Sequence, residues 1–115
     1  MLELSSVLIG FGVVDRHGER VGFVENVNIG RTCILVETGR SLIRRKHTHA
    51  VHAWAVREID IDTFTISLTA SKEEVVDAPE FRVLDQECET TIARYYYDHL
   101  AARGETLDAD ALEGA

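Results

Sequence analysis

Three histidines stand within six residues, at His47, His49 and His52, and they have the clearest potential for chemistry in this sequence. Neutral imidazoles are ligands for zinc, nickel and copper, so three of them could supply most of a metal site. On a regular strand, His47 and His49 would share a face and His52 would point the other way. We expect residues 46–53 to form a loop or an isolated helical turn, which would allow the three rings to converge.

Two other interpretations of these histidines remain open. A polar loop could carry them solvated or hydrogen bonded to the backbone, without any ligand. Imidazoles beside arginines should also lose protons easily, so the segment could be a pH-responsive interface. Arg45 and Lys46 would repel a dication, and no cysteine or carboxylate lies nearby in the sequence. We therefore expect no cofactor and keep zinc, nickel or copper binding as an alternative.

Arg44, Arg45 and Lys46 form a basic run that could contact the phosphates of RNA or of an anionic membrane. Edge strands also carry such charges simply to prevent aggregation, and this is the simpler interpretation. The net charge of the whole chain is −8, whereas nucleic-acid-binding proteins usually carry a basic surplus. A nucleic-acid partner is therefore not expected, and an RNA- or ribosome-associated role remains a second alternative.

Four aromatic residues indicate a protein interface. Trp54 follows the histidines, and a lone tryptophan in such a place usually anchors a core or an interface. Tyr95, Tyr96 and Tyr97 are consecutive, so on a helix they cover more than one side and at least one must point away from the core. Tyrosines are enriched at protein interfaces. We expect self-association, as a homodimer or a higher oligomer, or docking to another protein.

No catalytic motif is found in the 115 residues. The sequence contains no Walker loop, no G-x-S-x-G elbow and no H-E-x-x-H zinc motif. Gly10-Phe11-Gly12 lacks the third glycine and the following helix of a dinucleotide site. Cys33 and Cys88 form no C-x-x-C pair and are expected to be free thiols. We therefore assign no catalytic residue and expect a binding protein rather than an enzyme.

Charge is unevenly distributed along the chain. Residues 31–57 contain six basic residues against one glutamate, whereas residues 58–89 contain ten acidic residues against two basic ones. A dipolar surface of this kind steers encounters between proteins or subunits, although two solvated faces of opposite sign would give the same pattern. The start of the sequence carries Glu3 where a signal peptide has lysine or arginine, and the early apolar run is too short to span a bilayer. We expect a cytoplasmic protein without a membrane span.

Short apolar segments separated by glycine turns predict a mainly β fold. The expected strands are residues 7–14, 21–29, 32–38, 41–44, 55–61 and 63–68. Gly10 and Gly12 interrupt the first strand and indicate a bulge or a sharp bend. On the last strand, Phe64, Ile66 and Leu68 should share one face.

Two helices should follow the strands. Ser71-Lys72-Glu73-Glu74 has the S-x-x-E form of a capping box and should begin a short helix, which Pro79 prevents from continuing. Residues 85–103 predict a longer helix. Its buried stripe should consist of Ile92, Tyr96 and Leu100, with Cys88 one turn earlier.

The predicted fold is mainly β: a small, strongly bent antiparallel sheet or barrel of about six strands, followed by a short helix and one longer C-terminal helix. Residues 1–104 should form one domain, because this length suits a single core. Residues 105–115 are small and acidic, and we expect them to form a flexible tail.

Several segments, taken in order, resemble the PRC-barrel family. Residues 14–27, V-D-R-H-G-E-R-V-G-F-V-E-N-V, are similar to the opening hairpin of that family, V-x-D-x-x-G-x-x-I-G-x-V-x-D-V. Residues 59–60 and 65–69 resemble its final strands, and residues 71–81 resemble its S-K-E-E…A-P-x-aromatic ending. Tyr95-Tyr96 is similar to a tyrosine pair found after the barrel in several stand-alone members.

The resemblance implies a small PRC-type β-barrel that serves as an adaptor. The family includes the cytoplasmic part of the photosynthetic reaction-centre H subunit and the C-terminal domain of a ribosome-maturation factor. This sequence shows neither the transmembrane helix of the first nor the preceding domain of the second, and it has Ile43-Arg44 where relatives often have Ile-Pro. The family has no universal catalytic residues to transfer. We expect a non-enzymatic adaptor that docks to another protein or self-assembles.

Overall fold

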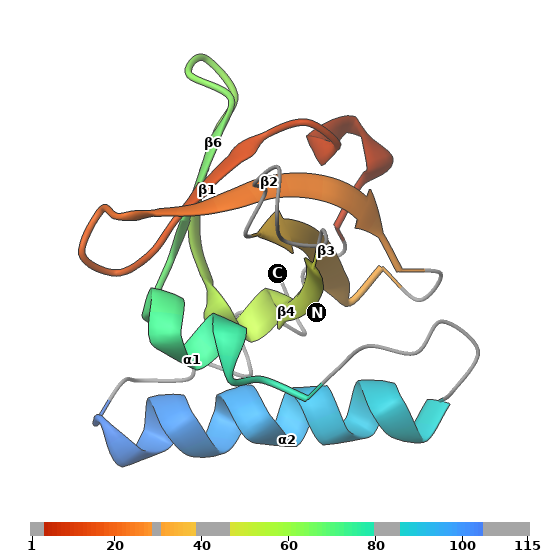
Figure 1. Ribbon diagram of the computed structural model, residues 1–115, viewed down its shortest axis with the longest axis vertical. Helices are drawn as coiled ribbons and strands as arrows, with labels where there is room; N and C mark the ends of the chain where they lie inside the picture. Colours follow the sequence, from red (N-terminus) through yellow and green to blue (C-terminus); the bar gives the residue numbers. More distant parts are fainter. Residues whose placement is uncertain (1–3, 29–30, 39–46, 80–85, 105–115) are drawn as a thin grey trace, which may run out of the picture.

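The computed structural model describes residues 4–28, 31–38, 47–79 and 86–104. The elements follow one another as η1 (Ser6–Leu8, a 3-10 helix), β1 (Gly12–Val14), β2 (Arg20–Val27), β3 (Cys33–Thr38), β4 (His47–His52), η2 (Ala53–Ala55), β5 (Val56–Asp60), β6 (Thr65–Leu68), α1 (Lys72–Val76) and α2 (Gln86–Ala102). The predicted class, mainly β with one short and one longer helix at the end, is confirmed (Figure 1). The predicted tail at residues 105–115 lies outside the described residues.

The strands form one curled sheet, half of a barrel, in the order β4-β3-β2-β1-β6-β5 (Figure 1). Neighbouring strands pair antiparallel except β1 and β6, which are parallel. The sheet is therefore mixed, which corrects the expectation that all its pairings are antiparallel. The reason is that β5 and β6 form a hairpin, and the second strand of this hairpin is the one that meets the free edge of β1.

The core lies inside the curl of the sheet and beneath the helices. All four residues from Cys33 to Val36 on β3 are buried, so this strand is covered on both faces. A strand buried on both faces has a continuous apolar run in place of alternation, as the sequence of β3 does. Helix α2 packs against β4 and η2, and α1 packs against β4 and β2.

Strands β2 and β3 approach each other so closely at Gly22 that no side chain would fit there. A Cβ atom on Gly22 would lie 1.9 Å from the carbonyl oxygen of Glu37 and 3.2 Å from a side-chain carbon of Val36. Glu37 pairs with Phe23 in the ladder between the two strands, so the close contact is part of the sheet itself. Gly22 is therefore required by packing.

The turn between β1 and β2 is organised by the carboxylate of Asp15, which is 1% exposed. Its Oδ1 accepts hydrogen bonds from the backbone N–H groups of His17, at 2.8 Å, and Glu19, at 2.9 Å. Its Oδ2 accepts a third from the N–H of Lys72, at 3.0 Å, which is the first residue of α1. One carboxylate thus closes the hairpin and also satisfies a free donor at the start of a helix.

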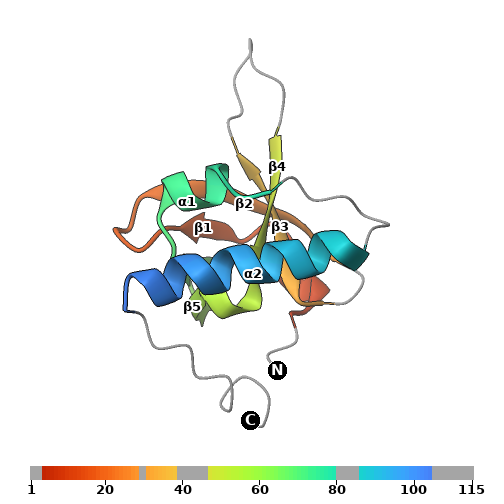
Figure 2. The same cartoon turned by 90° about the horizontal axis from the view of Figure 1, so that it is seen from below.

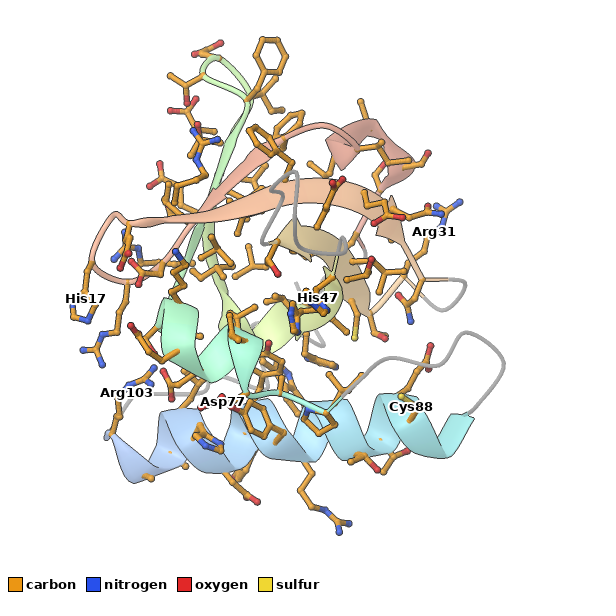
Figure 3. All side chains as sticks on the ribbon, in the orientation of Figure 1. His17, Arg31, His47, Asp77, Cys88 and Arg103 are labelled. Carbon is orange, nitrogen blue, oxygen red and sulfur yellow. The ribbon has the colours of Figure 1, made fainter. Side chains whose placement is uncertain are left out.

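The predicted capping box at α1 is present. The hydroxyl of Ser71 accepts from the N–H of Glu74 at 3.1 Å, and the carboxylate of Glu74 accepts from the N–H of Ser71 at 2.9 Å. Arg103, at the opposite end of α2 from Cys88 in Figure 3, forms an ion pair with Glu74. Its guanidinium also donates to the carbonyl oxygen of Thr69 at 2.5 Å. These contacts hold the C-terminal end of α2 against the N-terminal end of α1.

Helix α2 crosses in front of the strands when the protein is seen from below (Figure 2). Its buried residues are Cys88, Ile92, Tyr96 and Leu100, which confirms the predicted stripe. The hydroxyl of Tyr96 donates to the carbonyl oxygen of Ala50 on β4 at 2.8 Å. The hydroxyl of Tyr95 donates to the carbonyl oxygen of Glu74 at 2.5 Å, so this tyrosine holds α2 against α1.

The predicted strand at residues 7–14 is wrong in its first half. Ser5 caps the 3-10 helix η1, since its side chain accepts from the N–H of Val7 at 3.3 Å. Gly10 then adopts a positive φ of 92°, a conformation that glycine enters freely, and the chain turns into the short strand β1. The glycine thus ends one element and begins the next, where the sequence had indicated a bulge inside one strand.

The expectation of a loop or helical turn at residues 46–53 is also wrong. His47 to His52 form the strand β4, and each of its residues is paired with a residue of β3. Pairing with a buried neighbour decides the structure here, because strand preference depends on context more than on the residues themselves. The predicted strand at residues 41–44 lies outside the described residues.

Candidate functional site

Large exposed apolar side chains gather at the end of the sheet remote from α2. Four of them, 48–69% exposed, are Ile9, Phe23, Ile61 and Phe64, which we call the hairpin patch. Gly12 lies between Phe23 and Phe64: it pairs with Phe23 on β2, and its N–H donates to the carbonyl oxygen of Phe64 at 2.9 Å. Ile9 follows η1, which packs against β2. The turn between β5 and β6 projects at the top of Figure 1, away from α2.

Phe64 is the unusual member of the hairpin patch. Its φ is 53°, in the left-handed region that bulky residues rarely occupy. The side chain is 62% exposed, and the edge of its ring meets the buried ring of Phe11, with centroids 5.5 Å apart and planes at 90°. The sequence placed Phe64 on one face with Ile66 and Leu68. These two are buried, but Phe64 belongs to the turn before β6 and faces solvent.

Arg20 covers one side of Phe23. The guanidinium carbon lies 4.8 Å from the centre of the phenyl ring, which is a cation–π contact. Gly12 makes room for it, because a Cβ atom on Gly12 would come within 3.1 Å of the same guanidinium. The missing side chain at Gly12 therefore allows the arginine to lie flat against the sheet beside the phenylalanine.

Carboxylates border the hairpin patch. Five residues on five neighbouring strands form one row across the sheet. From β3 to β5 they are Glu37, Phe23, Gly12, Thr65 and Asp60. Residues paired across strands share a face, so Glu37 and Asp60 lie on either side of Phe23 on its own face. Asp62 stands exposed in the turn between Ile61 and Phe64, and Asp60 shapes this turn by accepting from the N–H of Asp62 at 3.0 Å. Among the described residues, Asp60 and Asp62 therefore bring negative charge to this border, whereas one carboxylate oxygen of Glu37 is buried.

The aromatic residues predicted to form an interface do not share one surface. Tyr96 is fully buried and Tyr95 is partly buried between the helices. Tyr97 is 50% exposed and is the outward-facing tyrosine that helix geometry required. Its ring meets that of the partly buried Trp54, with centroids 5.9 Å apart. Trp54 and Tyr97 form a second, smaller aromatic surface, which we call the Trp54–Tyr97 pair.

The strand β4 does not bring the three predicted metal ligands together. His47 and His49 lie two residues apart on one face, with ring centroids 6.3 Å apart (His47 is labelled in Figure 3). His52 is on the other face and is buried, and its Nδ1 accepts from the N–H of Trp54 at 3.1 Å. Within the described residues, no group of three or more histidine, cysteine, aspartate or glutamate side chains could hold a metal ion. Two imidazoles are fewer than a zinc site needs.

The buried His52 gives a testable pH dependence. Burial lowers its pKa to about 4 from 6.5, so between these values the unfolded chain binds a proton that the folded chain does not. Stability therefore falls as the pH falls through this window, by about 1.4 kcal/mol per pH unit. Between pH 7 and pH 5, we expect His52 to account for about 2 kcal/mol of lost unfolding free energy.

Urea unfolding of the wild type and of His52→Gln at both pH values measures this loss. The variant should lose about 2 kcal/mol less than the wild type over the interval, whatever its stability at pH 7. His17→Gln is the control for the loss of an exposed imidazole. Equal pH dependence in all three proteins would show that His52 does not stay neutral in the folded state.

The predicted anion-binding run, Arg44, Arg45 and Lys46, lies outside the described residues, so its geometry contributes nothing to the site. In the described part of the chain, no helix is both long enough and apolar enough to cross a membrane.

Sequence reasoning missed the residues of the hairpin patch. Phe23 was placed within the predicted strand at residues 21–29 without any sign of its exposure, and Phe64 was placed on one face of its strand with Ile66 and Leu68. A signal for Phe64 was present: Asp60, Asp62 and Thr63 are turn residues, and a short turn leaves its last residue little choice of backbone conformation. No comparable signal marks Phe23, whose exposure depends on how the sheet curls.

Comparison with known proteins adds no family to this description. No protein-family model matches the chain, and the search of curated proteins gives no significant match.

Proposed function

We propose that this chain is a non-enzymatic docking module that binds another protein through the hairpin patch. The observation that supports the proposal best is the set of apolar side chains at one end of the sheet, each about half exposed or more. Grouped apolar side chains on a protein surface mark interaction sites, because water is expelled when a partner covers them. Aromatic residues such as Phe23 and Phe64 are enriched in the centres of interfaces.

The scaffold suits this role. Phe23 stands in the middle of the sheet, paired on both sides by β1 and β3, and Phe64 is held by the hydrogen bond of its carbonyl oxygen to Gly12. Side chains whose backbone is held by such pairing and hydrogen bonding lose little freedom when they bind a partner. The resemblance of the sequence to PRC-barrel adaptors supports the same proposal, and membership of that family and a cytoplasmic location belong to the proposal as well.

The Trp54–Tyr97 pair is the competing surface for docking or self-association. It has one exposed aromatic ring against the four exposed side chains of the hairpin patch, so the patch offers more apolar area to a partner. The two surfaces also lie on different elements, since Tyr97 belongs to α2 and Phe23 to β2. One experiment can therefore tell them apart.

A photo-crosslinking amino acid placed at Phe23, and separately at Tyr97, tests the proposal in cells of the source. We expect Phe23 to give a discrete adduct with a second protein on illumination, and Tyr97 to give none. An adduct that contains only this chain would indicate a homo-oligomer at the patch. Adducts from Tyr97 alone would indicate that docking uses the Trp54–Tyr97 pair instead. The absence of adducts from both positions would contradict a docking function.

A further inference from the structure

We propose that Phe64 is the anchor of the hairpin patch, and that the patch receives an apolar segment flanked by lysine or arginine residues from another protein. This inference rests on the proposed docking function and names the chemistry of the partner. It is carried by the backbone of Phe64, by the exposure of its neighbours and by the charges on the border.

The backbone of Phe64 is difficult to explain by folding alone. At a φ of 53° glycine and asparagine are the comfortable residues, and a phenylalanine is strained. Strain of this kind is usually offset by burial of the side chain, but 62% of Phe64 remains exposed. The edge contact with Phe11 fixes the direction of the ring without covering it. The sequence thus keeps a strained phenylalanine that faces solvent, and such positions cluster at binding sites.

The neighbours of Phe64 extend it into a surface for apolar side chains. Ile61, in the same turn, is 69% exposed, and Phe23, reached across Gly12, is 52% exposed. We expect a partner that covers Phe64 to extend along the turn to Ile61 and across Gly12 to Phe23. Its contacting residues are therefore apolar at the centre, as in most protein interfaces.

The charges on the border determine what flanks the apolar segment. Asp60 lies in the row of Phe23, and Asp62 is exposed in the turn that carries Phe64. The guanidinium of Arg20 is also close, but it already lies over the ring of Phe23. Lysine or arginine on either side of the segment would meet the carboxylates, and the net charge of −8 would draw such a segment towards the protein.

The same charges disfavour two other occupants. A second copy docked patch to patch would bring Asp60 and Asp62 of both copies to the same interface, and like charges across an interface oppose binding. An anionic membrane would be repelled by the same carboxylates. A different protein chain with basic residues remains as the best match to the surface.

Selection of a random-peptide display library on the full chain tests the inference. We expect enriched peptides to carry a large apolar residue with lysine or arginine on at least one side, and their binding to weaken as salt is added. Phe64→Gly should bind these peptides at least tenfold more weakly, while its thermal unfolding midpoint stays the same or rises, because glycine relieves the strain. Tyr97→Ser is the matched control, an exposed aromatic outside the patch, and should bind like the wild type.

Each alternative result of these experiments would contradict one part of the proposal. Enriched peptides with acidic or uncharged residues beside the apolar residue would contradict the proposed basic partner. The crosslinking experiment at Phe23 would then show separately whether the patch binds a protein at all. Unchanged binding by Phe64→Gly, or a clear loss of its stability, would refute the anchor. Co-sedimentation of the chain with phosphatidylglycerol–phosphatidylcholine vesicles, abolished by Phe64→Gly, would replace the protein partner with a membrane. Self-association in sedimentation velocity, abolished by the same variant, would replace it with a second copy.

Discussion

Replacing Gly22 with alanine should lower the unfolding free energy by about 3 kcal/mol or more, or prevent folding. The new methyl group would lie 1.9 Å from the carbonyl oxygen of Glu37, and backbone atoms cannot yield as a flexible side chain can. Relief of the clash requires β2 and β3 to separate at a point where both are paired. Urea unfolding followed by circular dichroism measures the loss.

Gly12→Ala is the matched control for this prediction. Gly12 is also a buried glycine in the sheet, but its Cβ atom would meet only the end of the Arg20 side chain, at 3.1 Å. The arginine can move by a few tenths of an ångström, so a loss of about 1 kcal/mol or less is expected. If both glycine variants lost the same stability, the close approach of β2 and β3 would not be the cause.

Asp15→Ala should produce the other large effect, a loss of about 3–5 kcal/mol. The substitution removes the acceptor of three backbone N–H groups, two in the hairpin turn and one at the start of α1. Asp62→Ala is the control, because Asp62 is exposed in the turn between β5 and β6, and it should cost less than about 1 kcal/mol. Similar losses in both variants would mean that Asp15 acts as an ordinary turn residue.

Asp15 should also make stability fall at low pH. Burial alone would raise the pKa of its carboxyl group, but the three backbone N–H donors stabilise the charged form and bring the pKa below its usual 3.8. The stabilisation is therefore present above pH 3.8 and is lost as the pH falls through the lowered pKa of the folded protein. Asp15→Asn cannot titrate, so its unfolding free energy should change less than that of the wild type in this acidic range.

The parts of the fold that depend on local chemistry could be predicted from the sequence. The capping box at Ser71 and the stripe of Ile92, Tyr96 and Leu100 follow from hydrogen bonding and periodicity within one helix, and both are present. The strand β3 could be recognised because a run of apolar β-formers bounded by turns has few alternatives.

The parts that depend on partners distant in the chain could not be predicted. β4 is a strand because β3 pairs with it along its whole length, although the sequence from His47 to His52 has weak preferences of its own. The hairpin patch escaped notice for the same kind of reason. Phe64 could be grouped with Ile66 and Leu68 until the turn is known to hold it outside. Phe23 lies on a face of the sheet where Arg20 covers only one side of its ring and leaves the residue 52% exposed.

The one parallel pairing in the sheet has a consequence for the order of folding. The strands β1 to β4 pair in sequence as a meander, and β5 with β6 forms a hairpin, so each of these pieces closes only short loops. The two pieces meet where β1 pairs with β6, and this pairing consists of three residue pairs. Gly12 and Thr65, one of these pairs, are about fifty positions apart in the sequence. Closing that long loop has the largest entropic barrier in the sheet, which makes it the natural late step of folding.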